Sequence, residues 1–139
     1  MSVVWQASCV VIAGRAVLIE GPPGSGKSSL ALALLDRGAG LIGDDAVALQ
    51  PAGGRLFASP PPNVAGLIEV RNVGLLRRPV AEPAPVALVL VLDRDAPRFI
   101  ERAGRCERAG VRVPMVRLWP DSPVLALRAQ AALELHGLP

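Results

Sequence analysis

The chain has 139 residues, of which 51% are hydrophobic and 19% charged, which is enough for one packed core and too few charges for global disorder. Only 3% of the residues are aromatic, which argues against single-strand nucleic-acid modules built on exposed aromatic platforms. The formal charge of +3 comes from scattered arginines, and no apolar stretch reaches the ~18 residues of a membrane span. We therefore expect one soluble domain over residues 1–139, with neither nucleic acid nor a membrane as a partner.

The first half of the chain shows strand patterns interrupted by a glycine-rich segment. The expected elements, in chain order, are strands at Val3–Ile12 and Ala16–Glu20, a helix at Ser29–Arg37 ended by Gly38, a short strand at Leu41-Ile42, and a hairpin of Ala46–Leu49 with Leu56–Ala58. The turns between them are rich in Gly and Pro, as such connections usually are.

The second half alternates strands and helices more loosely. We expect a strand at Val64–Val70, a Pro-punctuated loop at Asn72–Pro85, a strand buried on both faces at Val86–Leu92, a helix around Ala96–Arg108, a strand at Val111–Leu118, and a last helix capped by Asp121 or Ser122, with Pro123 in its first turn and Gly137 behind it. Trp5 and Trp119 are interpreted as core or rim packing rather than as a ligand platform. The pattern predicts an α/β fold with a mixed sheet.

The cysteine and histidine content is low. With Cys9, Cys106 and a single His136, a zinc cluster cannot be assembled. Two thiols in a chain with this much core need no disulfide, which is typical of a reducing compartment, so a cytoplasmic location is expected.

A phosphate-binding motif lies between the second expected strand and the first expected helix. Residues Gly21 to Ser28 satisfy G-x-x-x-x-G-K-[ST], and Lys27 is the only lysine of the chain. In such a loop, successive backbone N–H groups converge on one anion at a helix N-terminus, the lysine reaches the β- and γ-phosphates, and the serine hydroxyl joins the Mg²⁺ shell. The sequence therefore predicts that ATP and Mg²⁺ bind here. The residues expected to contact the nucleotide are Gly21, Gly24, Ser25, Gly26, Lys27, Ser28 and Ser29.

Two groups of acids could serve phosphoryl transfer at this loop. Asp44-Asp45 follows the short strand Leu41-Ile42, and adjacent carboxylates repel each other, so a neighbouring cation is the natural explanation for the pair. Asp93 follows the buried strand Val86–Leu92, where it is either a second metal-site acid or a capping and loop acid. We favour the Asp44-Asp45 pair.

The span from the loop to the acid pair resembles a known family. Gly21–Ser28, Leu30–Gly38, Leu41–Val47 and the downstream segment Gly66–Arg71 with Gly74 look like the catalytic domain of HPr kinase/phosphorylase, in the short proteobacterial form without an N-terminal domain. The resemblance covers roughly residues 4–118. It implies a single P-loop domain with a fold akin to phosphoenolpyruvate carboxykinase. It also implies ATP-dependent phosphorylation of a serine on the phosphocarrier protein HPr, which regulates carbohydrate metabolism through the phosphotransferase system.

The resemblance also implies roles for individual residues. Asp44 would be the general base for the acceptor serine, and Lys27 and Arg71 would help to place the phosphates or the partner. Asp45 and Glu69 would lie near the metal together with Ser28. A carboxylate beside Mg²⁺ and within reach of a hydroxyl is what such a transfer requires.

Several positions depart from the family pattern. Gln6 stands where the family usually has His, Ser29 follows the loop where an acid is common, and Asn72 replaces a glycine. No Arg-Pro-Gly-Arg-Asn loop follows Pro114, so the sequence does not support phosphorolysis. Two alternatives stay open: a nucleotide-binding regulatory module with degenerate catalysis, and a small-molecule P-loop kinase.

Overall fold

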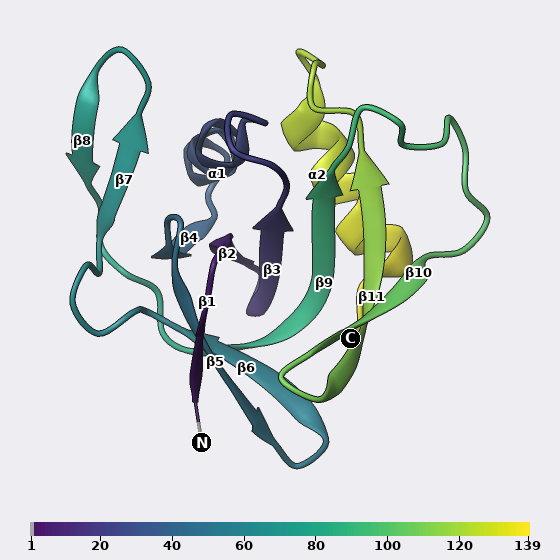
Figure 1. The fold of residues 1–139 in the computed structure, drawn as a ribbon, viewed down its shortest axis with the longest axis horizontal. Helices are drawn as coiled ribbons and strands as arrows, with labels where there is room; N and C mark the ends of the chain where they lie inside the picture. The colour runs from purple at the N-terminus through teal and green to yellow at the C-terminus, as the bar shows by residue number, and fades with distance from the viewer. Residues whose placement is uncertain (1) are drawn as a thin grey trace.

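The computed structural model describes residues 2–139 as a curled mixed sheet with two helices (Figure 1). The strands, in chain order, are β1 (Val3–Trp5), β2 (Ser8–Ile12), β3 (Arg15–Glu20), β4 (Gly40–Gly43), β5 (Val47–Ala52), β6 (Arg55–Ser59), β7 (Leu67–Val70), β8 (Gly74–Arg77), β9 (Ala84–Leu92), β10 (Gly104–Arg108) and β11 (Val111–Leu118). The helices are α1 (Lys27–Asp36) and α2 (Leu125–His136). The expected α/β class with a mixed sheet is confirmed.

Three parallel strands form the middle of the sheet. β9 lies between β3 and β11 and pairs in parallel with both, while β2 pairs antiparallel with β3 on one side and with β4 on the other. Because β3 and β4 are both antiparallel to β2, they run in the same direction. The carboxyl ends of β4, β3, β9 and β11 therefore meet at one edge of the sheet, where ligands of open α/β sheets usually bind.

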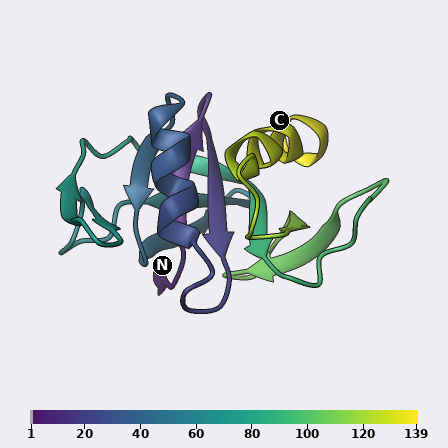
Figure 2. The same cartoon turned by 90° about the horizontal axis from the view of Figure 1, so that it is seen from above.

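The two faces of this sheet carry different layers. Both helices cover one face, side by side in Figure 2, whereas the antiparallel layer β1-β5-β6 covers the other. Alternate residues of β3 serve the two layers: Val17 and Ile19 belong to the helix-side core, and Ala16 and Leu18 belong to the opposite core. β3 and β9 are therefore apolar on both faces, as a central strand must be.

Two expected elements differ from the structure. The single strand expected at Val3–Ile12 is divided at Gln6-Ala7, because β1 pairs with β5 while β2 pairs with β3 and β4. The expected loop at Asn72–Pro85 contains β8, which pairs antiparallel with β7. The β7–β8 hairpin stands out from the main sheet in Figure 1.

The helix expected around Ala96–Arg108 is also wrong. Residues 93–103 form an irregular loop, and Gly104–Arg108 is strand β10, which pairs with β11 through a turn at Ala109-Gly110. Pro97 and Gly104 disfavour a continuous helix. Residues 104–108 form a strand because the free edge of β11 offers them hydrogen bonds. This partner lies outside residues 96–108, so the local sequence could not predict the pairing.

The structure agrees with the other expected strands. The strands expected at Ala16–Glu20 and Val111–Leu118 are β3 and β11, the expected hairpin is β5–β6, and the expected buried strand is β9. Helix α1 begins two residues earlier than expected. The expected cap of α2 is wrong, because the N-cap is Val124 rather than Asp121 or Ser122. The Ser122 hydroxyl nevertheless accepts a hydrogen bond from Val124 N, and Gly137 ends the helix as expected.

No helix within residues 2–139 is long and apolar enough to cross a membrane.

Candidate functional site

The glycine-rich loop connects the carboxyl end of β3 to the first residue of α1, Lys27. The loop is held closed by its own lysine, because Lys27 Nζ donates to the carbonyls of Gly21 at 2.9 Å and Pro22 at 3.2 Å. A turn bond from Ser25 N to Pro22 O, at 3.1 Å, completes the curl. The ammonium therefore lies inside the loop at the start of the helix, where the helix dipole and the lysine both favour an anion.

The polar groups of this loop are poorly satisfied by the protein. Ser25 Oγ is buried without a hydrogen-bond partner among residues 2–139, and the first N–H groups of a helix have no acceptor within it. Buried polar groups normally have hydrogen-bond partners, so these unpaired donors indicate a binding site for a ligand. A phosphate with its many acceptor oxygens has the matching chemistry.

The carboxylate of Asp44 lies beside the start of α1 and is held by three donors. Its Oδ1 accepts hydrogen bonds from Ser28 Oγ at 2.6 Å and from Ser8 Oγ at 2.9 Å. Its Oδ2 accepts a bond from the backbone N of Glu69 at 2.9 Å. Helix α1, strand β2 and hairpin β7–β8 thus all fix one carboxylate, and its orientation is set before any ligand binds.

Close backbone packing places Asp44 at this point. A side chain on Gly43 would put its Cβ 2.1 Å from the carbonyl oxygen of Ala46, so the turn that follows β4 requires glycine. Asp45 then adopts a left-handed conformation with φ 67°, which Asp tolerates better than most residues, and its side chain is exposed. The two acids of the pair are therefore not equivalent: Asp44 faces Ser28, and Asp45 faces solvent.

A hollow of about 530 Å³ brings most of the sequence-predicted residues together. It is lined by Pro23, Gly24, Ser25, Gly26, Lys27, Ser28, Ser29, Asp44, Asp45, Glu69, Arg71, Pro120 and Asp121. Among the predicted residues, Gly21 alone does not line it. Gly21 instead closes the base of the loop, because an added Cβ would lie 2.7 Å from Ser25 Oγ.

Asp93 lies apart from this hollow. Its Oδ1 accepts a bond from Asp95 N, and its Oδ2 pairs with Arg117 Nε at 3.5 Å. These contacts match the interpretation of Asp93 as a loop acid.

The oxygen donors of Ser28, Asp45 and Glu69, which line the same hollow, fit magnesium. Within residues 2–139, no group of three His, Cys, Asp or Glu side chains could hold a metal ion alone. Magnesium, however, usually keeps several waters and binds through one or two carboxylates together with substrate phosphates, so a full protein cage is not required. The Ser28 hydroxyl at the mouth of the phosphate loop and the carboxylates of Asp45 and Glu69 can supply such oxygens.

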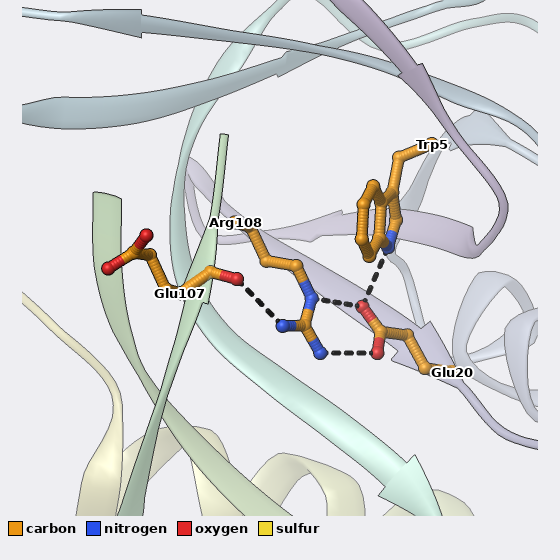
Figure 3. Close-up of polar contacts among 4 residues, drawn as sticks. All are labelled: Trp5, Glu20, Glu107 and Arg108. Atoms are coloured by element: carbon orange, nitrogen blue, oxygen red, sulfur yellow. Dashed lines mark hydrogen bonds and ion pairs between the residues drawn. The ribbon is translucent and has the colours of Figure 1, made fainter. Parts of the chain in front are cut away.

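An ion pair anchors the strand that leads into the loop (Figure 3). Glu20, the last residue of β3, accepts two bonds from Arg108 of β10, at 2.7 and 2.8 Å, and one from the indole N–H of Trp5 at 2.9 Å. The bond to Glu20 raises the pKa of Arg108, and burial raises the pKa of the nearby Cys106 thiol. Cys106 is therefore not activated by its neighbouring arginines.

Sequence reasoning missed Ser8, Pro120 and Asp121. Ser8 is 1% exposed and is the one buried polar residue of the core described over residues 2–139. Its signal was present in the sequence, since a lone hydroxyl in an apolar strand must find a partner. Pro120 and Asp121 reach the site because β11 ends at the same edge as β3, which no local pattern shows.

The comparisons with known proteins agree with this geometry. The model of the HPr Serine kinase C-terminal domain matches residues 2–79. HPr kinase/phosphorylase of Clostridium botulinum is 43% identical over 67 residues, which are 48% of this chain and 22% of that protein. The protein of the same name from Bordetella pertussis is 48% identical over 66 residues, 47% of this chain and 21% of that one. The chain thus spans about a fifth of the length of these relatives.

A solved structure, the Hpr(Ser) kinase/phosphatase from Coxiella burnetii, superposes with a TM-score of 0.83 at 29% identity and covers 95% of this chain and 88% of that chain. This likeness extends past the matched residues 2–79 into the second half of the fold. Since the family model alone covers more than half of the residues and includes the loop, the acid pair and the β7–β8 hairpin, the chain belongs to the HPr serine kinase C-terminal domain family.

Proposed function

We propose that this chain transfers the γ-phosphate of ATP to a serine of an HPr-type phosphocarrier protein. The observation that carries the proposal is the Asp44 carboxylate, which is held 2.6 Å from the hydroxyl of Ser28 at the mouth of the phosphate loop. Relatives named HPr kinase/phosphorylase and the similar solved structure support the choice of acceptor. We also propose that the reaction takes place in the cytoplasm, and the two free thiols, Cys9 and Cys106, support this location.

The residues of the phosphate loop, the acids Asp45 and Glu69, and Arg71 each have a role in this proposal. The backbone N–H groups at the start of α1 and the Lys27 ammonium hold the phosphates. Ser25 and Ser29 line the same hollow beside them. Ser28, with the acids Asp45 and Glu69, supplies oxygens to Mg²⁺, which neutralises phosphate charge when bound. Arg71 of the β7–β8 hairpin lines the same hollow, where it can orient the phosphates or the acceptor.

Asp44 is the general base of this proposal. Its three donors occupy both oxygens, and a carboxylate has about four acceptor sites, so one remains for the acceptor hydroxyl. Holding the carboxylate rigidly in this way favours proton transfer from a correctly placed serine.

The same three contacts favour a second candidate, a nucleotide-binding regulatory module without transfer. In that case Asp44 is a structural residue that ties α1, β2 and the β7–β8 hairpin together. Gln6, which lies exposed in the bend before β2 and cannot ionise, offers no substitute base.

Phosphorylation of HPr with labelled ATP and Mg²⁺ distinguishes these candidates. The wild type is expected to form acid-stable phosphoserine, and Asp44→Asn to lose transfer by about 10²–10⁴-fold while ATP binding, measured by calorimetry, persists. Asparagine suits the site structurally, because its carbonyl can face Glu69 N and its amide can face the two serine hydroxyls. Lys27→Ala is expected to lose ATP binding itself.

Asp93→Asn is the matched control, since this acid ends a neighbouring strand but does not line the hollow. Loss of transfer in Asp93→Asn with Asp44→Asn unaffected would reverse the assignment of the base. A wild type that binds ATP but never labels HPr would favour the regulatory module, and labelling of a small hydroxyl compound instead would favour a small-molecule kinase.

A further inference from the structure

A second hollow lies at the same edge of the sheet as the phosphate loop. It has a volume of about 320 Å³ and is lined by Ala96, Pro97, Arg98, Arg117, Leu118, Trp119 and Arg128. Trp119 lines this hollow, and the next two residues along the chain, Pro120 and Asp121, line the loop hollow.

The sheet order gives the separation of the strand ends that lie beside the two hollows. From β3, which carries the loop, the sheet continues through β9 to β11, which leads directly into Trp119. Adjacent strands lie about 4.8 Å apart, so the ends of β3 and β11 are separated by about 10 Å. A nucleotide extended along this edge, with its phosphates in the loop, would span that separation.

The direction of the nucleotide follows from Asp44. The acceptor serine must reach this carboxylate, which follows β4, so the transferred γ-phosphate lies on the β4 side of the loop. The nucleoside must then lie on the opposite side, toward β9 and β11. The hollow beside Trp119 occupies that side.

The lining of this hollow suits a nucleobase. Trp119 is 42% exposed, and its ring is held in place because the indole N–H donates to the carbonyl of Ala96. Arg128 lies over the ring, with its Cζ 5.9 Å from the centroid. Indole and guanidinium planes are the surfaces on which bases stack, and such stacking tolerates any base. Trp119 therefore does more than pack at the rim, because part of its ring stays exposed and can contact a ligand.

We propose that this second hollow receives the nucleoside of the nucleotide whose phosphates occupy the loop, with the base stacked against Trp119. The inference rests on the proposed function, since it needs a nucleoside triphosphate in the loop. It adds a specific recognition residue and predicts that affinity for ATP exceeds affinity for its phosphates alone.

Calorimetry with two ligands, Mg-ATP and Mg-tripolyphosphate, tests the inference. Wild type is expected to bind ATP more tightly than tripolyphosphate. Trp119→Ala should weaken ATP binding about tenfold or more and leave tripolyphosphate binding within about twofold, and Trp119→Phe should restore most of the loss. Retained tripolyphosphate binding shows that the variant is folded. Phe99→Ala is the matched control. Phe99 is an aromatic residue that is 79% exposed and follows the lining residues Ala96–Arg98, but it does not line the hollow itself. Its replacement should change neither affinity.

Two outcomes would overturn the inference while leaving the loop assignment in place. These are equal wild-type affinities for ATP and tripolyphosphate, and an equal loss of affinity for both ligands in Trp119→Ala. If neither ATP nor tripolyphosphate binds to wild type, the proposed function fails and the inference fails with it.

Discussion

Three residues contributed by distant parts of the chain meet at the candidate site. Asp44 follows β4, Ser28 lies in the first turn of α1, and Ser8 begins β2, yet both hydroxyls donate to the same carboxylate oxygen. A hydrogen bond to a charged group contributes more than one between neutral groups, and a buried hydroxyl without a partner would be costly. Ser8 therefore acts as a positioning residue for Asp44.

Removing the Ser8 hydroxyl tests this role. Ser8→Ala is expected to lower kcat for phosphoryl transfer about tenfold, because Asp44 loses one of the donors that fix its orientation, and to leave the Kd for ATP nearly unchanged. Single-turnover transfer and calorimetry measure the two quantities. Cys9→Ala is the control on the opposite face of β2: it should reduce stability without affecting the chemical step. An equal loss of kcat in both variants would assign Ser8 a merely structural role.

At the scale of elements, the site depends on two tight connections that follow parallel strands. The loop after β3 needs Gly21 for its closure, and the turn after β4 needs Gly43, where a side chain would collide with the backbone. Both connections end at the same sheet edge because β3 and β4 run in the same direction. Lys27 and Asp44 thus line the same hollow although β3 and β4 do not pair with each other.

Gly43→Ala is the sharpest probe of the second connection. Its Cβ would lie 2.1 Å from the Ala46 carbonyl oxygen, so the turn must move and carry Asp44 with it. We expect a loss of about 3 kcal/mol in the free energy of unfolding, measured in urea, together with loss of transfer. Gly14→Ala is the comparison, since no atom lies within 4 Å of its added Cβ, and only the backbone cost of about 1–2 kcal/mol should appear. Similar losses in the two variants would contradict the collision.

At the scale of the whole molecule, one ion pair connects the layers around the phosphate loop. Glu20 at the end of β3 is bonded to Arg108 of the β10–β11 hairpin and to Trp5 of β1, and Arg108 also lies over the Trp5 ring at 5.1 Å (Figure 3). The two charged side chains are only 17% and 15% exposed. Burial of this degree makes each charge dependent on the other.

Breaking this pair is expected to be costly. Glu20→Gln leaves the Arg108 guanidinium buried beside a neutral group and should lower the free energy of unfolding by about 3 kcal/mol. Arg94→Gln is the control, because the Arg94–Asp121 pair is 81% and 74% exposed with atoms 3.6 Å apart, and its loss should leave the Tm unchanged within error. Thermal and urea unfolding measure both variants. A Glu20→Gln protein as stable as wild type would show that the pair does not hold the layers together.

The sequence by itself determined the local features of this protein. The glycine-rich loop between a strand and a helix, the apolar run of β9, and the acid pair after a short strand are all encoded in consecutive residues, so spacing and residue type sufficed to predict them. The tertiary structure alone decided the contacts between segments distant along the chain. It divided Val3–Ile12 between two sheet layers and made residues 104–108 a strand, because the edge of β11 offered hydrogen bonds that outweigh weak helical propensity. It also brought Ser8 to Asp44 and Trp119 to the edge beside the loop, since only the direction of the paired strands determines which residues meet there.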